Sequence, residues 1–167
     1  VGLDGDEKQT FNAIRLRLSK LGSDFSINVL DATKAFELTL TEKPEGLPES
    51  ALALAAERGG GKSPEEGPWK IGLDMASYLP SMKHLKSSEI REKLYRAMVS
   101  RAAEKNEPLS KEILSLKTDQ ARILGYENYA DVSLARKMAK NVAEIDELHE
   151  LLAEKAVPAA KRELEEL

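Results

Sequence analysis

The chain has 167 residues and a formal net charge of -4, with 41% hydrophobic and 32% charged residues, a balance typical of a globular domain. Acidic and basic residues alternate along it, which leaves no basic stripe for nucleic acid and no polybasic cluster for anionic lipid. Without cysteine it forms no disulfides, and no apolar run reaches the length that spans a membrane.

The first segment predicts a long amphipathic helix from near Asp6 to about Phe36. Its apolar side chains recur three or four residues apart, at Phe11, Ile14, Leu18, Leu21, Phe25, Val29, Ala32 and Phe36. This seam repeats like that of a coiled coil, so we expect the helix to pack along another long helix.

Two short segments alternate between apolar and polar residues, as strands do. They are residues 37–41 and 69–73, and we expect them to pair antiparallel and to lie on the helices. Between them, Pro48 is placed to open a short helix over 49–57. Residues 58–68 hold four glycines and two prolines, which predicts a flexible loop.

The remainder of the chain predicts further helices, each with a start or stop residue. We expect a helix from Tyr78 to Leu85 capped by Ser77, a second capped by Ser87 or Ser88, a third opened by Pro108 and ended by Gly125, a shorter one from Asn128 through Met138, and a last one capped by Asn141 and kinked or split by Pro158. The predicted fold class is therefore mainly α, a single multi-helix lobe over 1–167 with one two-stranded antiparallel β pair.

His149 and Glu150 lie on the last predicted helix and resemble half of a zinc-binding H-E-x-x-H motif. That motif needs two histidines one helical turn apart, because both must face the zinc while the glutamate activates water. Ala153 occupies the second histidine position, and one imidazole cannot hold a catalytic zinc. We interpret His149 and Glu150 as an exposed pair on a charged helix.

Other chemically suggestive residues also favour structural roles. The run Gly59–Ser63 ends in G-K-S like a phosphate-binding loop, but Ala56 stands where that loop requires its first glycine, and a helix precedes it in place of a strand. His84 has no partner with metal-ligand spacing. Ser77, Ser100 and Ser110 have no neighbouring histidine and no nucleophile-elbow glycines. We therefore predict no catalytic, cofactor-binding or metal-binding residue in this chain.

Three long stretches of the chain are similar to one protein family. They are FNAIRLRLSKLGSDFSINVLDATKAFELTLT (11–41), GPWKIGLDMASYLPSMKHLKSSEIREKLYRAMVSRA (67–102) and EILSLKTDQARILGYENYADVSLARKMA (112–139). Together they resemble the thimet oligopeptidase family of zinc metallopeptidases, and within it the oligopeptidase A branch. Ala76 departs from the pattern, because the family usually has proline there.

The resemblance implies a zinc peptidase that cuts short, unfolded peptides in a deep channel between two largely helical lobes. In that family the two histidines of H-E-x-x-H and a later glutamate bind the zinc, and the motif's glutamate acts as base on the zinc-bound water. This chain matches the segment upstream of that motif. We therefore expect zinc in the parent enzyme but none in this chain, which would form part of the wall of the substrate channel and be inactive alone.

Two other functions stay open. The chain could be a free-standing, catalytically inactive binding or scaffold protein derived from the peptidase, or it could complement a separate catalytic chain. The expected partners are the catalytic remainder of the oligopeptidase and, in the full protein, short peptides, but neither nucleic acid nor membrane. The chain begins with Val1 and still reads as open helix from Lys161 to Leu167, so we expect a fragment or a processed chain. We expect it in the cytoplasm or in a chloroplast or mitochondrion, and not secreted.

Overall fold

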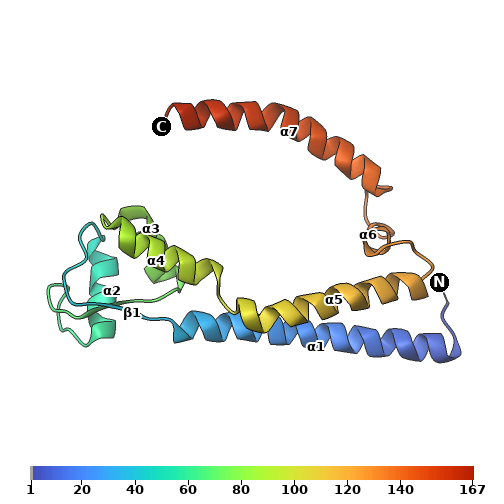
Figure 1. Ribbon diagram of the computed structural model, residues 1–167, viewed down its shortest axis with the longest axis horizontal. Coiled ribbons are helices and arrows are strands. Elements are labelled where there is room, and N and C mark those ends of the chain that lie inside the picture. The colour runs from blue at the N-terminus through green and yellow to red at the C-terminus, as the bar shows by residue number, and fades with distance from the viewer. Residues whose placement is uncertain (1) are drawn as a thin grey trace. The chain divides into compact units, whose positions relative to one another are not determined.

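A computed structural model describes residues 2–167 and confirms the mainly α fold with one antiparallel strand pair (Figure 1). Its elements, in chain order, are α1 (Gly5–Ala35), β1 (Leu38–Leu40), α2 (Glu49–Gly59), β2 (Trp69–Ile71), α3 (Met75–His84), α4 (Ser88–Val99), α5 (Ala103–Ile123), α6 (Tyr129–Leu134) and α7 (Val142–Glu165). None of the helices in the described part of the chain is long and apolar enough to cross a membrane.

The chain divides into two compact units. One unit contains the residues up to Ser19 together with Lys111–Leu167, and the other contains Lys20–Ser110. The long helices α1 and α5 each supply residues to both units. The expectation of a single lobe over 1–167 stays a prediction.

In the Lys20–Ser110 unit, the two predicted strands pair antiparallel, with Leu38 opposite Ile71 and Leu40 opposite Trp69. Each strand is three residues long, shorter than expected from the alternating pattern. Glu37, just before β1, lies outside the ladder but forms an ion pair with Lys70 of β2 at 2.8 Å. The strand pair lies against the core of this unit, which contains Leu52, Ala55, Ala56, Trp69, Ile71, Leu73, Leu85 and Leu94.

Helix α2 ends at Gly59, two residues later than the sequence pattern predicts, and Gly59 lies close to the backbone that leads into β2. A Cβ at Gly59 would lie 1.5 Å from the carbonyl oxygen of Pro68, so only glycine fits there. Gly60 then closes the helix with a φ of 94°, and the Gly61 N–H donates to Ala56 at 2.9 Å. Arg58 and Gly59 therefore belong to α2, and the flexibility of residues 58–68 stays a prediction.

Boundaries of α3, α5 and α6 also differ from the sequence predictions. Helix α3 starts at Met75, because Asp74 rather than Ser77 is the cap and accepts from the Ser77 N–H at 3.2 Å. Helix α5 begins at Ala103 and contains Pro108 in its second turn, where proline lacks the N–H that would bond to the carbonyl four residues earlier. Helix α6 ends at Leu134, four residues before the predicted end at Met138.

The other predicted caps are confirmed. Ser87 accepts from the Ile90 N–H at 3.3 Å at the start of α4, and Asn128 and Asn141 cap α6 and α7 in the same way. Gly125 stops α5 with a φ of 77°, and the following Tyr126 N–H donates to Ala121. Helix α7 continues through Pro158, so of the two expected effects the split does not occur and the kink stays a prediction.

Helix α5 lies beside α1, as the apolar seam of α1 predicts (Figure 1). In one unit, the Arg17 guanidinium donates two hydrogen bonds to the Glu112 carboxylate at 2.6 and 2.7 Å, which lowers the pKa of Glu112. In the other unit, Asn28 of α1 donates to the buried Asn106 of α5 at 2.9 Å, and Asn106 donates to the Phe25 carbonyl at 3.2 Å. These polar contacts set the register of the two helices.

Candidate functional site

His149 lies on α7 with its side chain exposed, and Ala153 follows one turn later on the same helix. Catalytic zinc sites use three protein ligands. Among the residues that the structure describes, no group of three or more His, Cys, Asp or Glu side chains could hold a metal ion. The donor set around His149 therefore does not fit a catalytic zinc, and no step of a hydrolytic reaction can be assigned to these residues.

In the glycine-rich turn after α2, a backbone N–H group bonds to an acidic side chain of the same turn. The Lys62 N–H donates to the Glu66 carboxylate at 3.0 Å, and a Cβ at Gly61 would lie 2.2 Å from the Glu66 carbonyl oxygen. A phosphate would need such backbone N–H groups for itself, and the Glu66 carboxylate would repel it. This geometry favours a structural turn over a nucleotide site.

His84 is the last residue of α3, and its side chain is exposed. Its carbonyl oxygen rather than its imidazole makes the close contact: a Cβ at Gly46 would lie 2.1 Å from it. Gly46, with a φ of 94°, allows this approach. His84 and His149 belong to different compact units, and each is placed by its helix rather than by a shared ligand.

A polar cluster that the sequence analysis missed lies where α2 meets the start of α3. Arg58 donates from Nη1 to the Asp74 carboxylate at 2.6 Å and to the Ser77 hydroxyl at 2.8 Å. These hydrogen bonds hold the pKa of Asp74 below its usual range, although burial acts in the opposite direction. Arg58 and Asp74 are sixteen positions apart in the sequence, so no local spacing signals the pair.

This cluster lies at the edge of a cavity of about 390 Å³ in the Lys20–Ser110 unit. The cavity is lined by Thr33, Lys34, Phe36, Glu37, Arg58, Lys70, Gly72 and Asp74. The cations Arg58 and Lys70 are paired with Asp74 and Glu37. Paired charges stabilise the contact between helix and strand, and they leave little net charge to attract a ligand.

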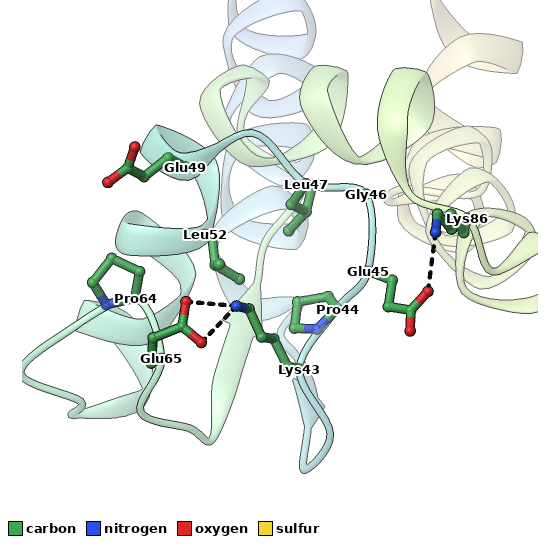
Figure 2. Close-up of a pocket in the computed structure, with 10 residues that line it drawn as sticks. All are labelled: Lys43, Pro44, Glu45, Gly46, Leu47, Glu49, Leu52, Pro64, Glu65 and Lys86. Atoms are coloured by element: carbon green, nitrogen blue, oxygen red, sulfur yellow. Dashed lines mark hydrogen bonds and ion pairs between the residues drawn. The ribbon is translucent and has the colours of Figure 1, made fainter.

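A larger open hollow of about 740 Å³ lies beside α2 (Figure 2). Figure 2 shows Lys43 directed at Glu65 and Lys86 directed at Glu45, with Pro44 between the two pairs. The Lys43 and Glu65 pair is 2.5 Å apart and the Lys86 and Glu45 pair 3.3 Å. The lining of this hollow contains neither a histidine nor a hydroxyl nucleophile, and two of its carboxylates, Glu65 and Glu45, are each held in an ion pair with a lysine.

Comparison with known proteins identifies a family for this chain, which the side chains of these sites do not. Residues 81–167 match the family model of Peptidase family M3. The whole chain is 45% identical to both the probable cytosolic oligopeptidase A and the organellar (chloroplastic/mitochondrial) oligopeptidase A of Arabidopsis thaliana, and 40% identical to the oligopeptidase A of Salmonella typhimurium. It covers 25%, 22% and 26% of those proteins, so it spans about a quarter of the length of the curated relatives it matches.

Proposed function

This chain belongs to peptidase family M3, and from that premise we propose that it is a non-catalytic helical portion of a zinc-dependent oligopeptidase that degrades short peptides. In this proposal residues 1–167 form one helical lobe and part of the wall of the substrate channel. The zinc is held by residues of the longer protein that this chain does not contain.

One observation carries the proposal. A chain that aligns over its whole length with oligopeptidases A, yet spans about a quarter of them, has the relationship of a part to a larger enzyme. The side chains support the same assignment, because a lone exposed imidazole followed by Ala153 lacks the ligands that a hydrolytic zinc requires.

The packing of α1 on α5 suits a wall that limits access. A channel that admits unfolded peptides and rejects folded proteins must keep its width, which calls for stiff walls. Helix α1 is 31 residues long and is tied to α5 by a bidentate Arg17–Glu112 pair and by the buried amide of Asn106. Bidentate and buried polar contacts fix geometry more firmly than apolar contacts alone.

The turn after α2 would serve as a mobile lip of this wall. Its glycines lower the barrier to backbone motion, and it is a largely exposed connection between α2 and β2. Amide hydrogen exchange tests this role: residues 60–67 should exchange faster than the core residues Leu52 and Ala55 of α2. Equal protection of the loop and the helix would argue against a moving lip.

Reconstitution tests the proposed function. The purified chain is mixed with the complementary remainder of an oligopeptidase A, zinc and a short fluorogenic peptide. We expect cleavage in the mixture, loss of cleavage on chelation, and no cleavage by this chain alone. If the remainder cleaves equally well without this chain, the chain is not part of the enzyme's working structure.

A binding or scaffold role is the second candidate, and the exposed apolar side chains of α1 favour it. Leu16, Ile27 and Leu30 are between 51% and 75% exposed. Such side chains often mark a surface for another protein. This role predicts a stable complex with a partner in which peptide cleavage does not change.

The relatives also bear on location. The two Arabidopsis relatives are named cytosolic and organellar, chloroplastic or mitochondrial. We infer that this chain also resides in the cytoplasm or in such an organelle rather than outside the cell. Fractionation of cells that express the tagged protein tests this inference, and recovery in the culture medium would contradict it.

A further inference from the structure

Helix α7 is long and amphipathic, yet none of its residues is buried. Ile145, Leu148 and Leu152 follow the i, i+3, i+7 spacing, and Ala156 and Ala159 continue the same stripe. Leu148 is 53% exposed and Leu152 is 56% exposed. This spacing is the one by which an amphipathic helix anchors in an apolar groove.

The opposite side of the helix carries no such stripe. Glu147, Glu150, Glu154 and Lys161 gather there at helical spacing, and all four are exposed. A helix with one apolar and one charged side presents the apolar side to protein. Since most helical stability comes from packing that side, a 24-residue helix with no buried residue lacks its packing partner.

The partner can be identified from the extent of the comparisons. The match to Peptidase family M3 covers residues 81–167 and therefore all of α7, so this helix belongs to the part that family members share. The relatives named oligopeptidase A are about four times as long as this chain, and the additional residues supply enough protein to cover the stripe.

We propose that the stripe Ile145–Leu148–Leu152 of α7 is the surface on which the rest of the oligopeptidase docks. The inference rests on the proposed function, because it takes the occupant to be the remainder of the same enzyme. The inference adds that the apolar face of α7 contacts that remainder. The other occupants, a second copy of this chain or the helices α1 and α5 of the same chain, are outcomes of the test.

The test places the photo-crosslinking residue benzoylphenylalanine at position 152. The full 167-residue chain is joined in place of the matching segment of the Arabidopsis cytosolic relative, so that the remainder is present. Position 150 on the charged face carries the same residue in a matched control. Mass spectrometry after illumination identifies the peptide that each position captures.

We expect position 152 to capture peptides of the remainder, and position 150 to give at least about tenfold less of that product. A second measurement uses Leu148→Asp and, as control, Glu147→Gln in the separate chain. The first should weaken binding to the remainder at least about tenfold, and the second should leave it unchanged.

The inference is overturned if position 152 captures α1, α5 or a second copy, or if both positions give equal yields. Peptide cleavage by the joined protein is recorded in parallel and reports on the proposed function separately. Capture of the remainder without cleavage would keep the docking surface and reject the function. Cleavage together with capture of α1 or α5 would support the proposed function and reject the docking surface.

Discussion

Arg58, Asp74 and Ser77 form the polar cluster that ties α2 to the start of α3. The Arg58 guanidinium is shared between a carboxylate and a hydroxyl, and the same carboxylate caps α3 through the Ser77 N–H. One ion pair therefore supports two elements. Both charged side chains remain more than a third exposed, so solvent screens much of the attraction.

The first prediction concerns Asp74 and pH. Its folded pKa is lowered, so its contribution to stability is present above the usual Asp pKa of about 3.9 and is lost as pH falls through the lower folded value. Asp74→Asn should cost about 1 kcal/mol at pH 7 through the lost ion pair with Arg58, since asparagine caps a helix about as well as aspartate. Urea unfolding at pH 7 and pH 3 measures this.

The difference between Asp74 and Asp74→Asn should shrink at pH 3, because that pH lies below the usual Asp pKa and the unfolded chain then binds a proton that folding must displace. Asp119→Asn is the matched control, since Asp119 pairs with Arg122 on the exposed surface of α5. It should change stability by less than about 0.5 kcal/mol. A pH-independent effect at Asp74 would show that the carboxylate's charge has no role.

The second prediction concerns Asn106, which is buried on α5. Its amide accepts from Asn28 and donates to the Phe25 carbonyl, so Asn106→Ala leaves the Asn28 amide without this partner. We expect a loss of about 1–3 kcal/mol in the free energy of unfolding, because the buried amide of Asn106 is removed and its half-buried partner Asn28 loses this hydrogen bond. A double-mutant cycle with Asn28→Ala should give a coupling of about 0.5–1.5 kcal/mol. Additive effects would contradict the hydrogen bond.

At the scale of elements, glycine decides where α2 stops and where β2 can approach. Gly59 lies on the last turn of α2 against the Pro68 carbonyl, whereas Gly22 lies inside α1 with no atom within 4 Å of its Cβ position. The same substitution therefore has opposite consequences in the two helices.

The third prediction follows from that contrast. Gly59→Ala should destabilise the chain by about 2 kcal/mol or more, because backbone must move to admit the methyl group. Gly22→Ala should stabilise it by about 0.5–1 kcal/mol, since alanine favours a helix interior. Thermal unfolding of both variants measures the two signs. If both substitutions stabilise the chain, a methyl group fits at position 59 and the predicted clash with the Pro68 carbonyl is absent.

Local sequence patterns predicted most elements, because the formation of a helix and the position of its ends depend on residues that are close in the sequence. The seam of α1, the caps Ser87, Asn128 and Asn141, and the stop at Gly125 were all readable. Local rules failed where packing overrides them. Pro108 lies inside α5 rather than at its start, and Asn106, two residues earlier, makes the hydrogen bonds that hold this first part of α5 against α1.

The candidate sites depend on contacts that sequence spacing does not encode. The pairing of Arg58 with Asp74 arises only when α2 and α3 pack, and the Glu66 carboxylate reaches the Lys62 N–H only once the turn has folded. The missing second histidine beside His149 was readable, because it depends on helical spacing alone.

For the whole molecule, family membership and side-chain chemistry give complementary information. Membership in peptidase family M3 links the chain to peptide hydrolysis, and the described residues offer no group of ligands for the metal that such hydrolysis uses. From both we propose that this chain forms part of the channel wall and contacts the remainder of the enzyme through α7, while the remainder holds the zinc.

The fourth prediction is made for the purified chain alone, by measuring bound zinc together with cleavage of a short fluorogenic peptide. The account predicts no stoichiometric zinc and no cleavage above a control without protein, and His149→Ala should change neither result. One zinc per chain that is lost in His149→Ala, together with cleavage that a chelator abolishes, would contradict the account.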